Sequence, residues 1–192
     1  MALVKAKRDE LLGPLSAVSG IIERRHTLPI LSNVLIDRDD GALSFLATDI
    51  EIQITARSTL AAGGDTRPLT VGARKLVDIL RALPEGVEVT LQPQDKRLQV
   101  KAGKSRFTLQ TLPAEDFPRL AKPVGDVARF ALPQKALRRL LGLVQYAMAQ
   151  QDIRYYLNGL LVLVEDKELR LVATDGHRLA YAAMALDRKS VV

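Results

Sequence analysis

Apolar residues near the start of the chain recur every three or four positions. They share one face of a helix: Leu11, Leu12, Leu15, Val18 and Ile22. A second run further along has the same spacing: Leu137, Leu140, Leu141 and Val144. The pattern therefore predicts two equivalent amphipathic helices, over residues 11–22 and 133–148, each packed against a sheet.

Apolar stretches broken by acidic turns follow each of these helices. The turns are residues 37–41 after the first helix and 165–167 after the second. Short apolar runs around such turns are typical of antiparallel strands joined by hairpins. In both regions the last of these strands ends in Ala-Thr-Asp, at 47–49 and at 173–175. A further strand is predicted after each, over 50–56 and 177–183.

These two regions are copies of one another at a fixed offset of 126 residues, without a gap. Identical residues include Leu31 and Leu157, Leu35 and Leu161, and both Ala-Thr-Asp triplets. A fainter copy lies between them, because residues 69–80 resemble residues 130–141 at an offset of 61. It predicts a short strand, a helix, and strands over 87–91, 97–102 and 105–110. Internal repeats take priority over local motifs, so the fold class is α+β, built from strand-helix-strand-strand-strand units.

The repeats define the expected domains. Two units make a first domain over residues 1–120, and residues 121–128 form a linker after a stretch marked by Pro113, Pro118 and Pro123. The third unit, over residues 129–192, is interpreted as the first half of a second, truncated domain.

The amino-acid composition excludes several kinds of functional site. The 192 residues include no cysteine and two histidines, which excludes disulfides and thiolate chemistry and argues against a metal site. We expect no cofactor. No signal peptide is recognised, and the longest apolar run, 160–164, is too short to cross a membrane. The chain is expected to be soluble and cytoplasmic.

Positive charge is concentrated on two of the predicted helices, which lie in segments 71–82 and 132–150. The formal net charge is +6. The segment 132–150 contains Lys135, Arg138 and Arg139 without an acidic residue, whereas many of the acidic residues lie in the hairpins. Basic helix faces bind phosphate backbones without reading sequence. Ordinary solvated helix faces are the alternative interpretation of the same pattern.

The segment Leu169–Met184 places Thr174, Asp175, His177 and Arg178 side by side. A carboxylate two residues from a histidine can orient an imidazole as a base, but the sequence offers no nucleophile elbow or phosphate loop. Ala-Thr-Asp also occurs in the first copy without a histidine. Threonine and aspartate therefore indicate a strand-turn device that binds nearby backbone N–H groups, and the chain is not expected to be an enzyme.

Several segments together carry a resemblance to a known family: RHTLPILSNVLI, RKLVDILRALPEG, SRFTLQTLPAEDFP, MAQQDIRYYLNGLLV and VATDGHRLA. In this order, they resemble the bacterial DNA sliding clamp, the β subunit of DNA polymerase III, and the proteobacterial members above all. The resemblance implies a DNA-clamp fold in which two subunits of three domains join head to tail as a ring around duplex DNA. Such a ring is a processivity factor that tethers the replicative polymerase.

The resemblance also implies site residues. For duplex DNA these are Arg25, Arg74, Gln151, Arg154, Tyr155 and Tyr156. For a pocket that binds peptide motifs of polymerase III subunits, the clamp loader and other proteins, they are Leu157, Thr174, Gly176, His177, Arg178 and Leu179. For the homodimer interface they are Lys75, Ile79, Leu83, Lys104, Arg106, Phe107 and Leu109; ordinary core is the alternative for Phe107.

Two other functions remain open at this point. One is a sequence-independent DNA-binding module that acts without a ring. The other is a truncated protein that competes for the binding partners of a clamp. Because the third domain is missing from this sequence, we expect the 192-residue chain not to form the closed dimer by itself.

Overall fold

A computed structural model describes residues 2–22, 28–39, 41–61, 67–121, 131–165 and 167–186. The chain forms two compact units, Met1–Lys122 and Pro123–Val192, and each is described by itself.

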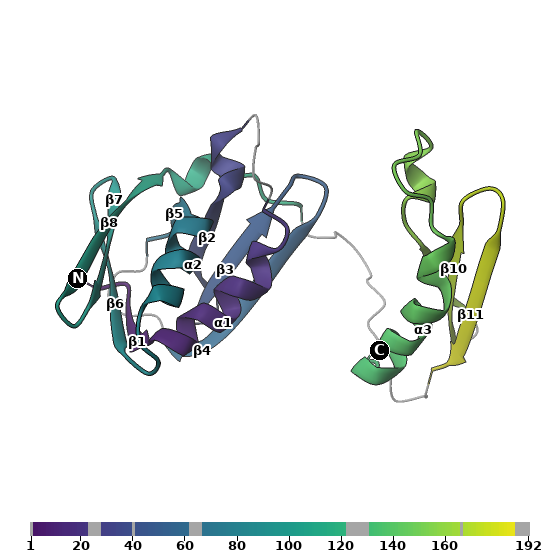
Figure 1. The fold of residues 1–192 in the computed structure, drawn as a ribbon, viewed down its shortest axis with the longest axis horizontal. Helices are drawn as coiled ribbons and strands as arrows, with labels where there is room; N and C mark the ends of the chain where they lie inside the picture. Colours follow the sequence, from purple (N-terminus) through teal and green to yellow (C-terminus); the bar gives the residue numbers. More distant parts are fainter. Residues whose placement is uncertain are drawn as a thin grey trace. The chain divides into compact units, whose positions relative to one another are not determined.

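The first unit consists of two layers, with two helices packed on one face of an antiparallel sheet (Figure 1). Its first half contains β1 (Val4–Lys7), α1 (Arg8–Ser19), the 3-10 turn η1 (Pro29–Ser32), β2 (Asn33–Asp39), β3 (Ala42–Thr48) and β4 (Gln53–Ala61). Its second half contains β5 (Leu69–Gly72), α2 (Ala73–Ala82), β6 (Glu88–Gln94), β7 (Arg97–Ala102), β8 (Ser105–Leu112) and the 3-10 turn η2 (Ala114–Asp116). Both halves thus have the predicted strand-helix-strand-strand-strand order.

The two halves exchange their first strands. The sheet order is β1-β6-β7-β8-β5-β2-β3-β4, so β1 pairs with β6 of the second half and β5 pairs with β2 of the first half. All these neighbours are antiparallel. The exchange joins two repeats into one sheet, which neither repeat would form alone.

The main core of this unit lies between the helices and the sheet. Leu11, Leu15 and Val18 are the buried face of α1, and α2 contributes Leu76 and Leu80 to the same cluster. Their spacing of three, four and seven residues places them on one helical face, as the sequence predicted.

A smaller cluster lies on the opposite face of β2 and β3. There Leu35 and Leu46 are covered by Phe117, which follows η2. The segment after η2 is also held by an ion pair between Arg119 and Asp37. Both faces of this part of the sheet are therefore buried.

The second unit has one helix and a three-stranded sheet. It contains α3 (Gln134–Val144), the 3-10 turns η3 (Gln145–Ala147) and η4 (Tyr155–Leu157), and the strands β9 (Leu161–Glu165), β10 (Glu168–Thr174) and β11 (Leu179–Ala185). The sheet order is β11-β10-β9. Leu140 and Val144 of α3 pack on Leu169, Leu171 and Ala173 of β10.

The bounds of the elements follow the 126-residue offset. It carries the first residue of α1 onto the first residue of α3, β3 onto β10 with identical bounds, and the start of β4 onto the start of β11. The predicted equivalence of the two helices is confirmed. The short strand predicted before α3 would begin at residue 130, which lies outside the described residues, and residues 131–133 form no strand.

Several predicted boundaries were wrong. The strand predicted from residue 50 begins at Gln53, and the strand predicted from His177 begins at Leu179. In both cases the preceding aspartate binds backbone N–H groups of the turn and delays the strand. The predicted helix bounds were also wrong: α1 has the predicted length of 12 residues but begins three residues earlier, and α3 is shorter than the predicted 133–148. α1 ends at Ser19, although Ile22 remains buried, and α3 gives way to η3 after Val144.

Candidate functional site: a polar corner and its pocket

The corner between β10 and β11 is held by two side chains. The Thr174 hydroxyl donates to the carbonyl of Arg178 at 2.7 Å and accepts from the Gly176 N–H at 3.1 Å. Asp175 Oδ1 accepts from the N–H groups of His177 and Arg178 at 2.9 and 3.0 Å. Threonine and aspartate thus satisfy three of the turn's backbone donors.

The corner between β3 and β4 has the same hydrogen bonds at the offset of 126. Thr48 donates to the Ile52 carbonyl and accepts from Ile50, while Asp49 Oδ1 accepts from Glu51 and Ile52. The prediction that threonine and aspartate form a structural strand-turn device is therefore confirmed. Any difference in function between the copies lies in the other side chains.

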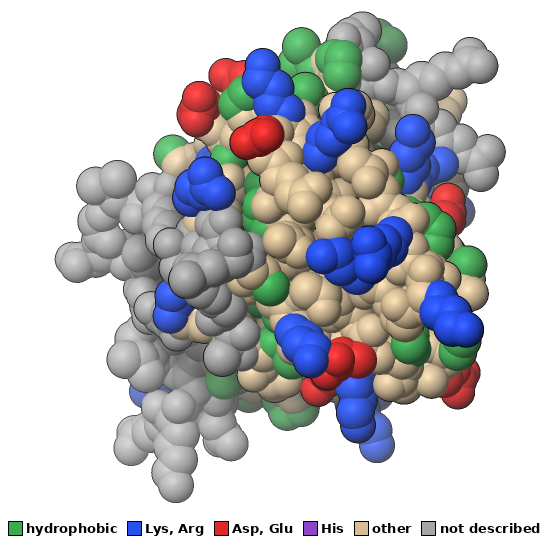
Figure 2. All heavy atoms as spheres, turned by 90° about the vertical axis from the view of Figure 1, so that its left-hand side faces the viewer, with side chains coloured by type: hydrophobic (Ala, Val, Ile, Leu, Met, Phe, Trp, Pro, Cys, Tyr) green, Lys and Arg blue, Asp and Glu red, His purple; other side chains and the backbone are tan. Residues whose placement is uncertain are grey.

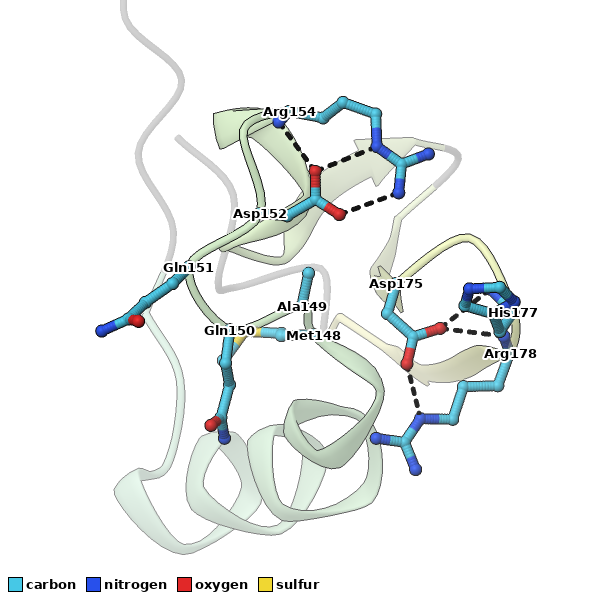
Figure 3. A pocket seen from close by; sticks show the side chains of 9 residues that line it. All are labelled: Met148, Ala149, Gln150, Gln151, Asp152, Arg154, Asp175, His177 and Arg178. Carbon is cyan, nitrogen blue, oxygen red and sulfur yellow. Dashed lines mark hydrogen bonds and ion pairs between the residues drawn. The ribbon is translucent and has the colours of Figure 1, made fainter.

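A surface pocket of about 460 Å³ adjoins the second corner (Figure 3). The loop after α3 and the residues following β10 line it: Met148, Ala149, Gln150, Gln151, Asp152, Arg154, Asp175, His177 and Arg178. The two walls of the pocket are thus 21 or more residues apart in sequence, and the fold brings them together.

Each wall contains a carboxylate paired with an arginine of its own segment. Arg154 donates to Asp152 from Nε at 3.0 Å and from Nη2 at 2.8 Å, as well as from its backbone N–H. The side-chain and backbone hydrogen bonds from Arg154 lower the pKa of Asp152 to about 2. On the other wall, Arg178 Nε donates to Asp175 Oδ2 at 3.0 Å.

The electrostatics keep both carboxylates ionised. Backbone hydrogen bonds from His177 and then Arg178 lower the pKa of Asp175, because they stabilise the charged form. Neither carboxylate is therefore available as a proton donor at neutral pH. Arg154 and Arg178 have further guanidinium N–H groups that these pairs leave unused, which suits them to bind carbonyl or carboxylate oxygens of a ligand.

Arg154 and Gly176 connect the two walls. A Cβ atom added to Gly176 would lie 3.3 Å from one Arg154 guanidinium nitrogen and 3.4 Å from the other. Gly176 also has a φ of 89°, a left-handed conformation that glycine adopts without steric cost. These two observations account for a glycine at this position.

Arg178 is further positioned by an aromatic ring. Its guanidinium carbon lies 5.5 Å from the centroid of Tyr146, which belongs to η3. A cation over an aromatic face is attracted by the ring quadrupole. Tyr146, Asp152 and Gln150 were not singled out from the sequence, because their relation to the corner depends on how the chain folds after α3.

The predicted peptide-pocket residues divide into two groups. His177 and Arg178 are exposed and line the pocket. Leu157, Thr174, Gly176 and Leu179 do not line it, although Leu179 is 65% exposed and Leu157 is half-buried. The described pocket is polar, and the two leucines of the implied peptide-binding set are not part of its lining.

The predicted DNA-contacting residues are mostly on the surface. Gln151, Arg154, Tyr155 and Tyr156 are exposed, and the two tyrosine rings meet edge to face at 5.9 Å. Gln151 and Arg154 share the pocket with His177, so the structure brings these two sets together. Arg74 is exposed on α2, where Nη2 donates to the Ile22 carbonyl at 3.2 Å. Arg25 lies outside the described residues.

Three of the predicted dimer residues, Arg106, Phe107 and Leu109, belong to a strand with an open edge, β8. Residues 105–110 of β8 pair with β7, but only Thr111 and Leu112 pair with β5. Beside this edge is a groove of about 490 Å³ that Arg74, Lys75 and Leu109 help to line.

The predicted dimer residues differ in how exposed they are. Lys75, Lys104 and Arg106 are exposed. Leu83 and Leu109 belong to the core cluster, and Ile79 and Phe107 pack against it while remaining partly exposed. Core packing thus accounts for part of this apolar set.

Charge is less segregated than the sequence suggested. α2 and α3 are net basic, but α1 combines a largely buried Arg8 with Asp9 and Glu10. Figure 2 shows the side of the molecule that faces left in Figure 1, where β6, β7 and β8 lie, and Lys and Arg side chains are spread across it. Arg97, Lys104 and Arg106 of these strands and their turns are exposed. Basic residues are therefore not confined to the helices.

Two family models match the chain in succession. The N-terminal domain of the DNA polymerase III beta subunit matches residues 3–121, and the central domain of the same subunit matches residues 131–191. The chain belongs to the DNA polymerase III beta subunit family. The resemblance seen in the sequence is thereby confirmed, and so is the clamp fold, since solved structures of the family superpose on both units.

Relatives from several bacteria are similar over nearly the whole chain. The beta sliding clamp of Salmonella typhimurium is 50% identical over 181 residues, which cover 94% of this chain and 49% of that protein. The beta sliding clamp of Pseudomonas aeruginosa is 48% identical over 178 residues, or 93% of this chain and 48% of that protein. The chain spans about half the length of these relatives.

Solved structures of the family agree in fold. The DNA polymerase III subunit beta from Pseudomonas aeruginosa has a TM-score of 0.88 at 47% identity, over 94% of this chain and 49% of that one. A sliding clamp from the same organism bound to griselimycin has a TM-score of 0.87 at 45% identity, over 98% of this chain and 51% of that one.

Two further properties concern the described residues alone. No helix among them is long and apolar enough to cross a membrane. Their His, Asp and Glu side chains form no group of three or more that could hold a metal ion.

Proposed function

We propose that this chain is part of a DNA sliding clamp, a processivity factor that encircles duplex DNA and tethers a replicative polymerase. The observation that carries the proposal is the match to two successive domains of the DNA polymerase III beta subunit over residues 3–121 and 131–191. The first clamp domain would comprise residues 1–120, residues 121–128 the linker, and residues 129–192 the first half of the second domain. The clamp acts in the cytoplasm and catalyses no reaction itself.

The polar corner of the second unit takes part in peptide binding in this proposal. The open N–H groups of Arg154 and Arg178, the exposed His177 and the exposed Leu179 offer polar and apolar contacts to one extended segment. Peptide recognition commonly combines a buried apolar anchor with a polar rim. A relative of known structure binds griselimycin. The partners would be subunits of the polymerase, the clamp loader and other proteins with a clamp-binding motif.

DNA contacts are assigned to basic and aromatic surface residues. The residues with exposed side chains that can reach a phosphate backbone are Arg74 on α2, and Gln151, Arg154, Tyr155 and Tyr156 after α3. Arg25 is assigned to the same role from the sequence alone. Such contacts position the protein on DNA without reading bases.

A head-to-tail homodimer would close the ring. The open edge of β8 at residues 105–110 and the groove with Lys75 and Leu109 support an interface there. An unpaired strand edge is a template for pairing with another chain, and Phe107 is only partly covered by its own core.

Retention on DNA tests the proposal. The full-length gene product is loaded by the clamp loader onto nicked circular plasmid, and the bound fraction is measured by gel filtration before and after the plasmid is cut. A topological clamp is retained on the circle and lost from the linear form. Equal retention on both forms would favour a DNA-binding module without a ring. Loss of polymerase stimulation alone, in a Leu179→Asp variant that still loads, would assign this residue to partner binding.

A further inference from the structure

The corner of the first copy has the same backbone as the polar corner but an apolar surface. Ile50, Ile52 and Leu28 are 49%, 57% and 49% exposed. At the offset of 126 these three residues take the positions of Gly176, Arg178 and Arg154. Where the second copy places two arginines around a glycine, the first copy thus presents three exposed aliphatic side chains.

Ile50 is held in an unfavourable conformation. Its φ is 84°, in the left-handed region, which is a genuine outlier for a β-branched residue. The hydrogen bonds of Thr48 and Asp49 impose this backbone, as they do on Gly176 in the other copy. Core packing does not explain an isoleucine here, since about half of the side chain is exposed. Strain of this kind is a reason to look for a function.

The patch extends to the segment after η2. Leu120 is 43% exposed, and its N–H donates to Gln53 Oε1 at 2.9 Å, which places it beside the start of β4. Leu28, Ile50, Ile52 and Leu120 are called the isoleucine corner below. Clustered exposed apolar side chains with polar neighbours are typical of protein interaction sites.

The charges around the isoleucine corner indicate what binds it. In the second copy, Asp175 Oδ2 accepts from Arg178 Nε at 3.0 Å. In the first copy Ile52 takes the position of that arginine, so Asp49 lacks the neighbour that Asp175 has in Arg178. The corner therefore keeps the carboxylate of an arginine–aspartate pair but not the arginine. A ligand that brings an arginine would complete the pair with charge-assisted hydrogen bonds.

We propose that the isoleucine corner is a second docking site, for a protein segment that presents an arginine beside an apolar side chain. The arginine pairs with Asp49 as Arg178 pairs with Asp175, and the apolar side chain packs on Ile50 and Ile52. The site lies on the first unit, and its residues are distinct from those of the polar corner. It goes beyond the proposed clamp function and does not depend on it.

The internal repeat supplies the key variant. Ile52→Arg places an arginine where the second copy has Arg178. The new arginine should pair with Asp49 and so block the site. A library of random heptapeptides on phage is selected on the full-length protein and depleted on Ile52→Arg, which removes peptides that bind elsewhere. We expect the recovered peptides to share an arginine next to an apolar residue. Their affinity should fall by about tenfold or more in Asp49→Asn, which loses the charge of the pair.

The controls separate this site from the polar corner. Leu179→Asp in the second unit should leave binding of the selected peptides unchanged, and Ile52→Val should keep it. In NMR spectra, an added peptide should shift the signals of Leu28, Ile50, Ile52 and Leu120. Three results would overturn the proposal: selected peptides without a basic residue, equal binding to Asp49→Asn, or changes in signals of residues 131–186 caused by Ile52→Arg, which would show that the second unit covers the patch.

Discussion

The corners at 48–52 and 174–178 have one backbone and two surfaces. In both, threonine and aspartate accept or donate the same four hydrogen bonds, and the residue after the aspartate has a φ near 84° or 89°. The other two positions of the corner are Ile50 and Ile52 in the first copy and Gly176 and Arg178 in the second.

This comparison separates structural from functional residues inside one motif. A histidine and an aspartate two positions apart invite a catalytic interpretation, yet the aspartate is occupied by backbone N–H groups in both copies. What differs is therefore what each surface can bind. A repeated polar turn supplies a rigid frame, and a few exposed side chains decide its ligand.

The largest expected difference in stability comes from equivalent residues that differ in burial. Leu35 in β2 is 0% exposed, whereas its counterpart Leu161 in β9 is 55% exposed. Leu35→Ala should cost about 2–5 kcal/mol, because it leaves a cavity in a packed core, and Leu161→Ala less than about 1 kcal/mol. Hydrogen exchange of each unit in urea measures both. Equal costs would show that Leu161 is buried in solution.

The next largest effect concerns the left-handed position of each corner. Gly176→Ala should destabilise the second unit by about 1–2 kcal/mol, because an L side chain disfavours this φ and its Cβ would crowd Arg154. Ile50→Gly should be close to neutral, since relief of strain offsets the greater entropy of glycine when unfolded. Thermal unfolding of the two variants checks this. A strongly destabilised Ile50→Gly would contradict the strain at Ile50.

Thr48 and Thr174 should contribute equally to the stability of their units. Thr48→Val and Thr174→Val each remove a hydroxyl that donates to a carbonyl and accepts from an N–H. Each should cost about 1–2 kcal/mol, because two hydrogen bonds of modest net value are lost. Urea unfolding with residue-level hydrogen exchange gives the two values. A cost confined to Thr174 would mean that the corner serves only the second copy.

The smallest expected effect concerns the pKa of Asp152. Asp152 and Arg154 replace His26 and Leu28 of the first copy, so the ion pair belongs to the second copy alone. The pKa of Asp152 is lowered from 3.8 to about 2. A folded pKa below the unfolded one means that the pair stabilises the fold above pH 3.8 and is lost as the pH falls towards 2.

Arg154→Gln tests this assignment. It should return the pKa of Asp152 towards 3.8, because the side-chain hydrogen bonds from Arg154 are the largest cause of its shift. Carbon-detected NMR titration of the carboxyl group measures it. An unchanged pKa would assign the shift to the backbone N–H of residue 154.

Much of the fold could be predicted because repeats and periodicity are local properties of a chain. The spacing of Leu11, Leu15 and Val18 identified the buried face of α1, and the offset of 126 identified the equivalent elements. The role of Thr174 and Asp175 was also predictable, since their bonds reach only two to four residues along the chain. Strand starts were placed too early because those same bonds extend the turn.

By itself, the sequence determined the repeat unit, the helix faces, the polar turns and the family. Only the tertiary structure decided which strands are exchanged between repeats, since β1 pairs with β6 across more than 80 residues. It also decided that Arg154 meets Gly176 in one pocket and that Leu35 is buried while Leu161 is exposed. The physical reason is the same in each case. Burial and contact depend on which segments pack together, and the residues on either side in the chain do not specify that partner.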